Sequence, residues 1–149
     1  ISGDAHGGSS SARVAARTSD NGCLRQSIAA RLNQTGTGKY EISGWFKAKQ
    51  NALATISMHI KGKEDWGNDY FIELEELKAG EWTKLSAVID VQWKGKADYA
   101  YINAPDTMLS AIETLVDDLE MKKVEPVTGE IEYTPVTEGS YTLLETFVY

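Results

Sequence analysis

The chain has 149 residues, 42% of them hydrophobic and 25% charged, a composition typical of one globular domain with its own core. Its formal net charge is −7, which argues against nucleic acid and anionic membranes as partners, because both are bound by clustered Lys and Arg side chains. No apolar run approaches the roughly 20 residues of a membrane-spanning helix.

The first part of the chain carries few structural signals. Residues 1–11 are polar and rich in glycine, and they lack the pattern of a signal peptide. Leu24, Ile28 and Leu32 then recur at the i, i+4, i+8 spacing of a helix. This spacing alone predicts a helix, and we leave the structure of the segment open.

The middle of the chain alternates between apolar and polar residues, which predicts half-buried strands. The alternating segments are residues 40–48, 54–61, 70–74, 83–91 and 98–104. Glycines with polar neighbours separate them, at Gly62, Gly67, Gly80 and Gly95. Many short strands joined by turns indicate an all-β fold, either a sandwich or a barrel.

The last third is less regular. A second helical spacing joins Met108, Ile112, Leu115 and Leu119, but we expect at most a short turn at residues 109–113, followed by a strand, on the resemblance given below. Residues 125–140 hold two of the three prolines and no basic residue, which predicts an acidic linker or arm. Residues 141–149 again read as a strand.

Motifs of catalysis and metal binding are missing from the sequence. It contains no P-loop, no GxSxG and no HExxH motif. With two histidines and one cysteine we do not expect a structural zinc site, and Cys23 has no partner for an intrachain disulfide. The acidic residues lie mostly in charge runs that are typical of solvated faces, so we do not expect an enzyme.

Aromatic residues are the main candidates for binding. The chain has four Trp, seven Tyr and three Phe, and the C–H faces of sugar rings stack on aromatic planes while their hydroxyls need hydrogen-bond partners. Tyr99, Tyr101 and Asn103 alternate with apolar residues, so they lie together on an open face if the apolar set is core. His59 offers polar surface one strand away, and residues 66–70 form a loop rich in rings and amides.

The tryptophans differ in their expected roles. We interpret Trp82 as a core residue at the start of a strand and Trp45 mainly as a packing residue. Trp93 has two interpretations, a cap at a sheet end or a ligand contact. Trp66 stands among charged residues, where a core role is least plausible, so we expect it to contact ligand.

Seven short segments, in this order and spacing, resemble the carbohydrate-binding modules of family 22 and of the related families 4 and 9. The resemblance covers roughly residues 8–124. Its carriers are Gly8-Ser9-Ser10-Ser11-Ala12-Arg13-Val14, Arg17-Thr18, Asn21-Gly22 before Arg25, Gly38-Lys39-Tyr40-Glu41-Ile42-Ser43-Gly44-Trp45-Phe46-Lys47, Gly80-Glu81-Trp82-Thr83-Lys84-Leu85, Tyr99-Ala100-Tyr101-Ile102-Asn103 and Leu115-Val116-Asp117-Asp118-Leu119.

The resemblance implies a jelly-roll-like β-sandwich of two antiparallel sheets that is not an enzyme. It implies a concave groove for β-1,4-xylan or mixed-linkage β-glucan, and a secreted, monomeric module that targets a covalently attached glycoside hydrolase to the plant cell wall. The first alternative is a structural or adhesive β-sandwich without a sugar groove. The second is a small glycan-active enzyme that uses Glu73 or Asp117.

The expected ligand-binding residues come from the aromatic pattern and from the resemblance together. They are Tyr101, Asn103, Tyr99, Trp66, Tyr70, His59, Trp93 and Arg25. Tyr70 matches a groove tyrosine of the family, with Phe71 as the alternative match. The family's groove tryptophan is absent, with Asp20 in its place, and Trp66 or Trp93 would substitute for it. Asp117 matches a ligand of a structural calcium ion.

The domain boundaries follow from the same comparison. We expect the sandwich at residues 1–124, the acidic segment at 125–140 and a separate strand at 141–149. Leu144-Glu145-Thr146-Phe147 looks like the family's opening strand, displaced to the other end of the chain. It either opens a following module or folds back onto this sandwich, and we favour the fold-back because the sandwich would otherwise expose an apolar edge.

Overall fold

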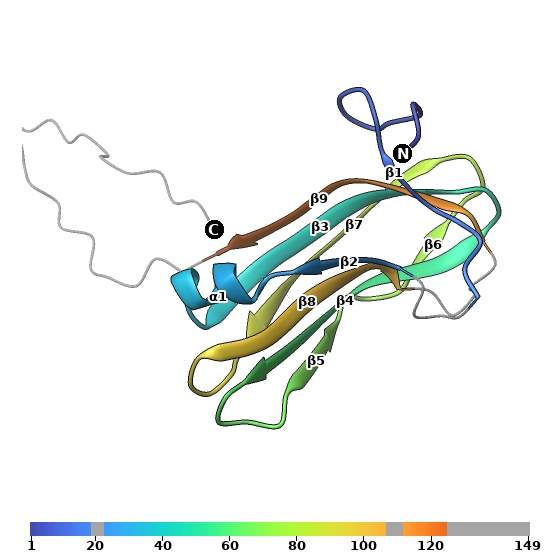
Figure 1. Cartoon of the computed structure of the whole chain (residues 1–149). Helices are drawn as coiled ribbons and strands as arrows, with labels where there is room; N and C mark the ends of the chain where they lie inside the picture. The colour runs from blue at the N-terminus through green and yellow to red at the C-terminus, as the bar shows by residue number, and fades with distance from the viewer. Residues whose placement is uncertain (19–22, 107–111, 125–149) are drawn as a thin grey trace, which may run out of the picture.

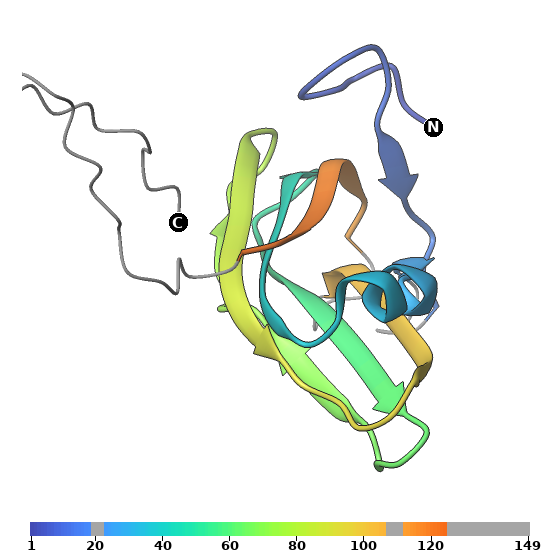
Figure 2. The same ribbon diagram turned by 90° about the vertical axis from the view of Figure 1, so that its left-hand side faces the viewer.

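The computed structural model describes residues 1–18, 23–106 and 112–124. These residues form nine strands and one helix, and the strands build two sheets that pack face to face (Figures 1 and 2). The elements are β1 (Ala12–Val14), β2 (Leu24–Ser27), α1 (Ala29–Thr35), β3 (Gly38–Ala48), β4 (Ala52–Gly62), β5 (Asn68–Phe71), β6 (Glu75–Leu77), β7 (Trp82–Val91), β8 (Ala97–Asp106) and β9 (Thr114–Lys123). The predicted all-β sandwich is confirmed.

Every strand pairing within the described residues is antiparallel. One sheet has the order β1-β9-β3-β7, and the other has the order β2-β8-β4-β5, with β6 also paired to β4. The long strands β3, β4, β7, β8 and β9 are the predicted alternating segments and the strand expected after residue 113.

The core lies between the two sheets, where each long strand contributes every second side chain. Strand β3 buries Tyr40, Ile42 and Phe46, and β4 buries Ile56 and Met58 beneath them. The alternation that the sequence predicts for these strands is therefore the alternation of core and outer faces.

The segment left open at residues 24–32 divides into a strand and a helix. Residues of β2 pair with β8, and the Ile28 N–H still donates to Ala100 O before α1 begins. The helix buries Leu32, and it ends at Gly36, whose φ of 76° suits glycine. Ile28 and Leu32 are both buried although only Leu32 is helical, so a helical spacing is compatible with a strand followed by one short helix.

Trp82 is not a core residue, contrary to the prediction. It pairs with Lys47 on the outer face of β3 and β7, where its ring meets the ring of His6 edge-on at 5.9 Å. The His6 ring stacks on Trp45, with ring centroids 3.7 Å apart. Both tryptophans therefore pack beneath the N-terminal segment rather than between the sheets.

Several predictions lie outside the described residues. These concern Asp20 and Asn21-Gly22, Met108, residues 109–111, the acidic segment 125–140 and the strand-like segment 141–149. In the described part of the chain, no helix is long and apolar enough to cross a membrane.

Candidate functional site

The outer face of the five-stranded sheet collects most of the predicted binding residues. Antiparallel register places residues in rows across the strands, because paired residues point to the same side of a sheet. One row runs Ser27, Tyr101, His59 and Asp69, and the next runs Arg25, Asn103, Ser57 and Phe71. Tyr99 lies two residues before Tyr101 on the same face. We call these nine residues the aromatic face.

The alternation predicted for β8 is confirmed. Ala100, Ile102 and Ala104 are buried in the core, while 51% of the Tyr99 surface is exposed. Tyr101 and Asn103 are half-buried on the outer face, between neighbouring side chains rather than in the interior.

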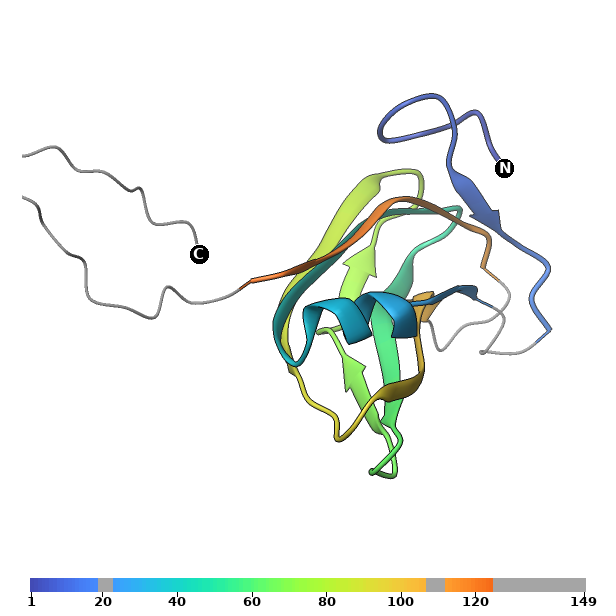
Figure 3. The ribbon, with the colours of Figure 1, turned by 60° about the vertical axis from the view of Figure 1, so that its left-hand side comes forward.

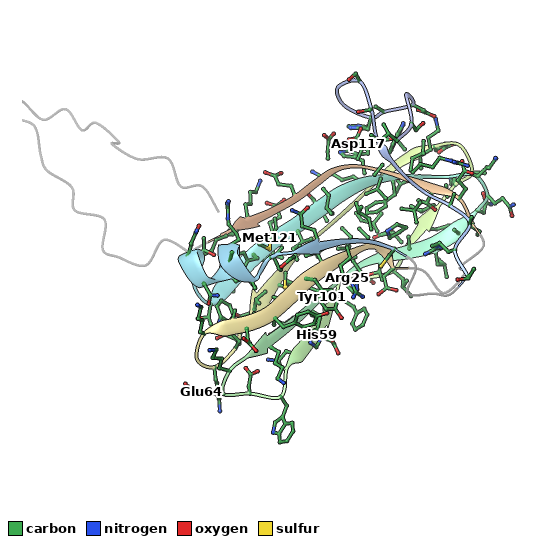
Figure 4. All side chains as sticks on the ribbon, viewed as in Figure 1. Arg25, His59, Glu64, Tyr101, Asp117 and Met121 are labelled. Carbon is green, nitrogen blue, oxygen red and sulfur yellow. The ribbon has the colours of Figure 1, made fainter. Side chains whose placement is uncertain are left out.

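Tyr101 lies at the centre of the aromatic face and is held on both sides (Figure 4). The Arg25 guanidinium lies over its ring, 4.0 Å from the centroid, and the His59 ring stacks beside it at 5.3 Å and 25°. Arg25 approaches from β2 and His59 from β4, the strands on either side of β8. The ring faces of Tyr101 are therefore used within the protein, and its edge and hydroxyl remain for a ligand.

His59 is oriented by a carboxylate. Its Nδ1 donates to Asp69 Oδ1 at 2.5 Å, across the β4–β5 pair. This contact assigns the proton to Nδ1 and turns Nε2, the other ring nitrogen, into a hydrogen-bond acceptor in the neutral ring. Asp69 could not be predicted as a partner of His59, because only the strand register brings the two residues together.

A chain of hydrogen bonds fixes the Asn103 amide. Arg25 Nε donates to Asn103 Oδ1 at 2.9 Å, and Asn103 Nδ2 donates to Ser57 Oγ at 3.2 Å. Arg25 forms no ion pair with any residue that the structure describes. Its guanidinium carries five N–H groups, of which the structure engages the Nε–H with Asn103, so further donors remain on the aromatic face.

Three aromatic side chains offer exposed rings. Tyr99 contacts Tyr101 edge-on at 5.1 Å and remains 51% exposed. Phe71 is 62% exposed beside Ser57, and Trp66 is fully exposed in the loop between β4 and β5. Planar surface for stacking is thus supplied around Tyr101 rather than by Tyr101 itself.

Asp65 organises the loop that carries Trp66. Its carboxylate accepts hydrogen bonds from the backbone N–H groups of Gly62, Gly67 and Lys94. These bonds, with the one from Lys94 first, lower the pKa of Asp65 below its ordinary value. Gly67 has a φ of 99° and lies so close to His59 that an added Cβ would come within 3.3 Å of its ring. The loop is therefore fixed against one end of the aromatic face.

Tyr70 and Trp93 do not join the aromatic face. Tyr70 pairs with the buried Met58, so it points to the inner side of β5 and packs against the core. Its hydroxyl accepts from Gln92 N at 2.9 Å and donates to Gln92 O at 3.2 Å. Trp93 is also half-buried against the core. The alternative match, Phe71, is the residue that points outward.

Asp117 serves as a hydrogen-bond acceptor for the N-terminal segment. Its Oδ2 accepts from the backbone N–H groups of His6 and Gly7, and its Oδ1 accepts from the Asp118 N–H. These bonds, Gly7 first, lower the pKa of Asp117. Within the described residues no group of three His, Cys, Asp or Glu side chains could hold a metal ion. Because both carboxylate oxygens already accept backbone hydrogen bonds, the described contacts do not support the calcium ion expected at Asp117, and chelation is its test.

Solved structures of carbohydrate-binding modules share this fold. The CBM22-2 xylan-binding domain of Paenibacillus barcinonensis Xyn10C superposes with a TM-score of 0.70 and 17% identity, over 83% of this chain and 84% of that domain. The C-terminal family 22 carbohydrate binding module of Clostridium thermocellum Xyn10B gives 0.66 and 16%, over 80% and 76%.

A third similar structure is the Clostridium thermocellum Xyn10B CBM22-1-GH10 pair complexed with xylohexaose, with a TM-score of 0.66 and 20% identity. It matches 81% of this chain, which spans 23% of that larger protein. At these identities the likeness shows the fold.

Comparison of the sequence with protein families shows more than the fold alone. No curated protein gives a significant match. The sequence model of the family CBM_4_9, described as a carbohydrate binding domain, matches residues 1–107 and thereby includes α1 and the strands β1 to β8. Since the match covers most of the chain and the whole aromatic face, this protein belongs to the CBM_4_9 family of carbohydrate binding domains.

Proposed function

We propose that the chain is a non-catalytic module that binds β-1,4-xylan on its aromatic face. The observation that carries this proposal is the combination of exposed Tyr99 and Phe71 rings with the oriented polar groups of Arg25, His59 and Asn103 on one open sheet face. Stacking on exposed rings needs no charge on the ligand, which suits a neutral polysaccharide.

The polar groups complement the hydroxyls of a sugar chain. Arg25 supplies N–H donors and His59 Nε2 supplies an acceptor, while the Tyr101 hydroxyl can do both. Because Asn103, Asp69 and Arg25 already hold these groups in place, a ligand orders few side chains on binding. Stacking with several hydrogen bonds then gives a micromolar affinity, on the order of −6 to −8 kcal/mol.

The absence of catalysis is part of the proposal. Glycoside hydrolysis commonly uses two carboxylates that face each other across the scissile bond. Among the nine residues of the aromatic face, Asp69 is the one carboxylate, and its Oδ1 is engaged by His59. The module would instead act outside the cell, where it would hold an attached glycoside hydrolase close to plant cell wall polysaccharide.

We expect xylan rather than mixed-linkage β-glucan as the ligand, because similar solved structures include a module described as xylan-binding and one complexed with xylohexaose. A β-glucan chain presents comparable ring faces, so it is the second ligand to test. A structural or adhesive sandwich would leave the exposed rings of the aromatic face without a ligand.

Affinity electrophoresis separates these functions. In native gels that contain xylan, β-glucan or mannan, we expect the protein to be retarded by xylan most strongly, and a variant of the opposite sheet face, Val88→Ala, to be retarded equally. Unretarded migration in every gel would refute sugar binding. Release of reducing sugar from xylan would refute the non-catalytic role.

A further inference from the structure

Two loops border one end of the aromatic face. Residues 63–67 connect β4 to β5 and residues 92–96 connect β7 to β8, and Figure 3 shows these green and yellow loops side by side at the lower end of the molecule. Lys63 N donates to Lys96 O at 2.9 Å, and the Asp65 carboxylate accepts from backbone N–H groups on both sides of the contact. The backbone at this end is therefore held by bonds between the loops.

Three lysines extend the outer side of the sheet at this end. Lys61 is directly opposite Tyr99 in the register of β4 and β8, so both side chains leave the same face. Ala97 in the next row is buried, so Lys63 and Lys96 in the row beyond it point outward again. All three lysines are exposed. We call Lys61, Lys63 and Lys96 the lysine cluster.

The ammonium groups of the lysine cluster form no ion pair with any residue that the structure describes. The carboxylates of this end belong to Glu64, Asp65, Asp69 and Asp98. Asp65 is engaged by three backbone N–H groups, and Asp69 by His59. The charges of Glu64 and Asp98 remain against those of the three lysines, so positive charge prevails beside the exposed Tyr99 ring.

This arrangement suits a ligand that carries isolated carboxylates. A carboxylate can pair with these lysines without breaking an existing ion pair. The whole chain has a net charge of −7, so a polymer that is charged at every unit would be repelled by the rest of the surface. A neutral sugar backbone with occasional acidic side groups avoids this repulsion. Uronic acids, which are sugars with a carboxylate in place of the primary alcohol, are side groups of this kind.

We propose that the protein prefers xylan substituted with uronic acids, and that the lysine cluster binds their carboxylates. The proposal rests on the proposed function, because the xylan backbone must lie on the aromatic face. Opposite residues of neighbouring strands have Cβ atoms about 4.5–5.5 Å apart. A sugar that stacks on Tyr99 therefore brings the carboxylate of its side group within reach of Lys61, with Lys63 and Lys96 beyond.

One polymer in two forms tests this preference by isothermal titration calorimetry. Glucuronoxylan and the same polymer after chemical reduction of its carboxyl groups to alcohols share their backbone and side groups and differ in charge. At low ionic strength the Kd of the reduced form should be about three to five times higher, since an exposed ion pair contributes up to about fivefold. The ratio of the two Kd values should approach one in about 1 M NaCl, where exposed charges are screened.

Lysine variants locate the effect. Lys61→Gln should lower the ratio of the two Kd values about twofold, and substitution of all three lysines of the cluster by Gln should bring it to about one. Lys84→Gln is the matched control. Lys84 is exposed and lies opposite Trp45 on the outer face of the other sheet, and it also lacks an ion pair within the described residues. This variant should keep the ratio of the parent protein.

The outcomes separate this proposal from xylan binding itself. Equal Kd values for both forms of the polymer would overturn the preference for uronic acids and leave xylan binding in place. A preference that persists in the triple variant would overturn the assignment to the lysine cluster. If neither form binds, xylan binding on the aromatic face is refuted, and the preference falls with it.

Discussion

Removal of one exposed ring from the aromatic face should weaken sugar binding without weakening the fold. Phe71 is 62% exposed, and an aromatic side chain presents about 150–250 Å² in total. If a sugar ring covers half of the exposed part, about 50–80 Å² leaves water, worth about 1.2–2 kcal/mol at ~25 cal/mol/Å². Phe71→Ala should therefore raise the Kd for xylohexaose about tenfold.

Tyr99→Ala should give a similar loss, because 51% of that residue is exposed. Isothermal titration calorimetry measures each Kd, and thermal unfolding should show Tm within about 2 °C of the parent, since little of either ring packs in the core. Val88→Ala is the matched control, because Val88 is 55% exposed on the outer face of the other sheet. An unchanged Kd in both aromatic variants would refute the assignment of the aromatic face as the binding site.

Three further results are expected. Tyr70→Phe removes two hydrogen bonds to the Gln92 backbone, so it should destabilise the fold by about 1–2 kcal/mol in urea unfolding. The Kd for xylohexaose should stay unchanged, and a raised Kd would show that Tyr70 contributes to the binding site. Asp65 has a lowered pKa in the folded protein, so its carboxylate should stabilise the fold at any pH above the ordinary Asp pKa. The difference in Tm between the parent protein and Asp65→Asn should shrink as the pH falls through the lowered pKa of Asp65. A difference in Tm that is independent of pH would contradict this role. Chelation with EDTA should leave Tm unchanged, because backbone N–H groups occupy the Asp117 carboxylate, whereas a Tm lowered by EDTA and restored by added Ca²⁺ would establish the calcium site.

The sequence predicts the sheet faces well wherever apolar and polar residues alternate strictly. Strand β8 shows this, since Ala100 and Ile102 are small or apolar and their neighbours Tyr99 and Tyr101 can remain in contact with water. The same rule also corrects the prediction for Trp82. Leu85 and Val91 are buried, so a period of two places residue 82 on the outer face.

The choice between Tyr70 and Phe71 could not be made in this way. Two aromatic residues stand next to each other, and either could face inward without breaking the pattern. The register with β4 decides, because Tyr70 is opposite the buried Met58 and Phe71 is opposite Ser57 on the outer face. Register depends on contacts between distant segments, which local periodicity does not contain.

Contacts between residues that are far apart in the chain could not be predicted from the sequence either. Asp69 orients His59 across a strand pair, and Asp117 accepts hydrogen bonds from His6 and Gly7, which lie more than 100 residues away. In the sequence, Asp65 is one of several charged residues close together. In the structure, its carboxylate joins two loops by accepting hydrogen bonds from the backbone N–H groups of Gly62 and Lys94. Each of these roles appears only once the strands are placed side by side.

The register of the aromatic face also limits the size of its ligand. Tyr99 and Phe71 lie on β8 and β5, two strands apart, and their rows are separated by four residues along β8. With about 4.8 Å between strands and about 3.4 Å per residue, their backbones are roughly 16 Å apart. One or two linked sugar rings cannot cover both side chains. Affinity in calorimetry should therefore increase from xylobiose to xylohexaose, and equal affinity for both would mean that the two rings do not act on one chain.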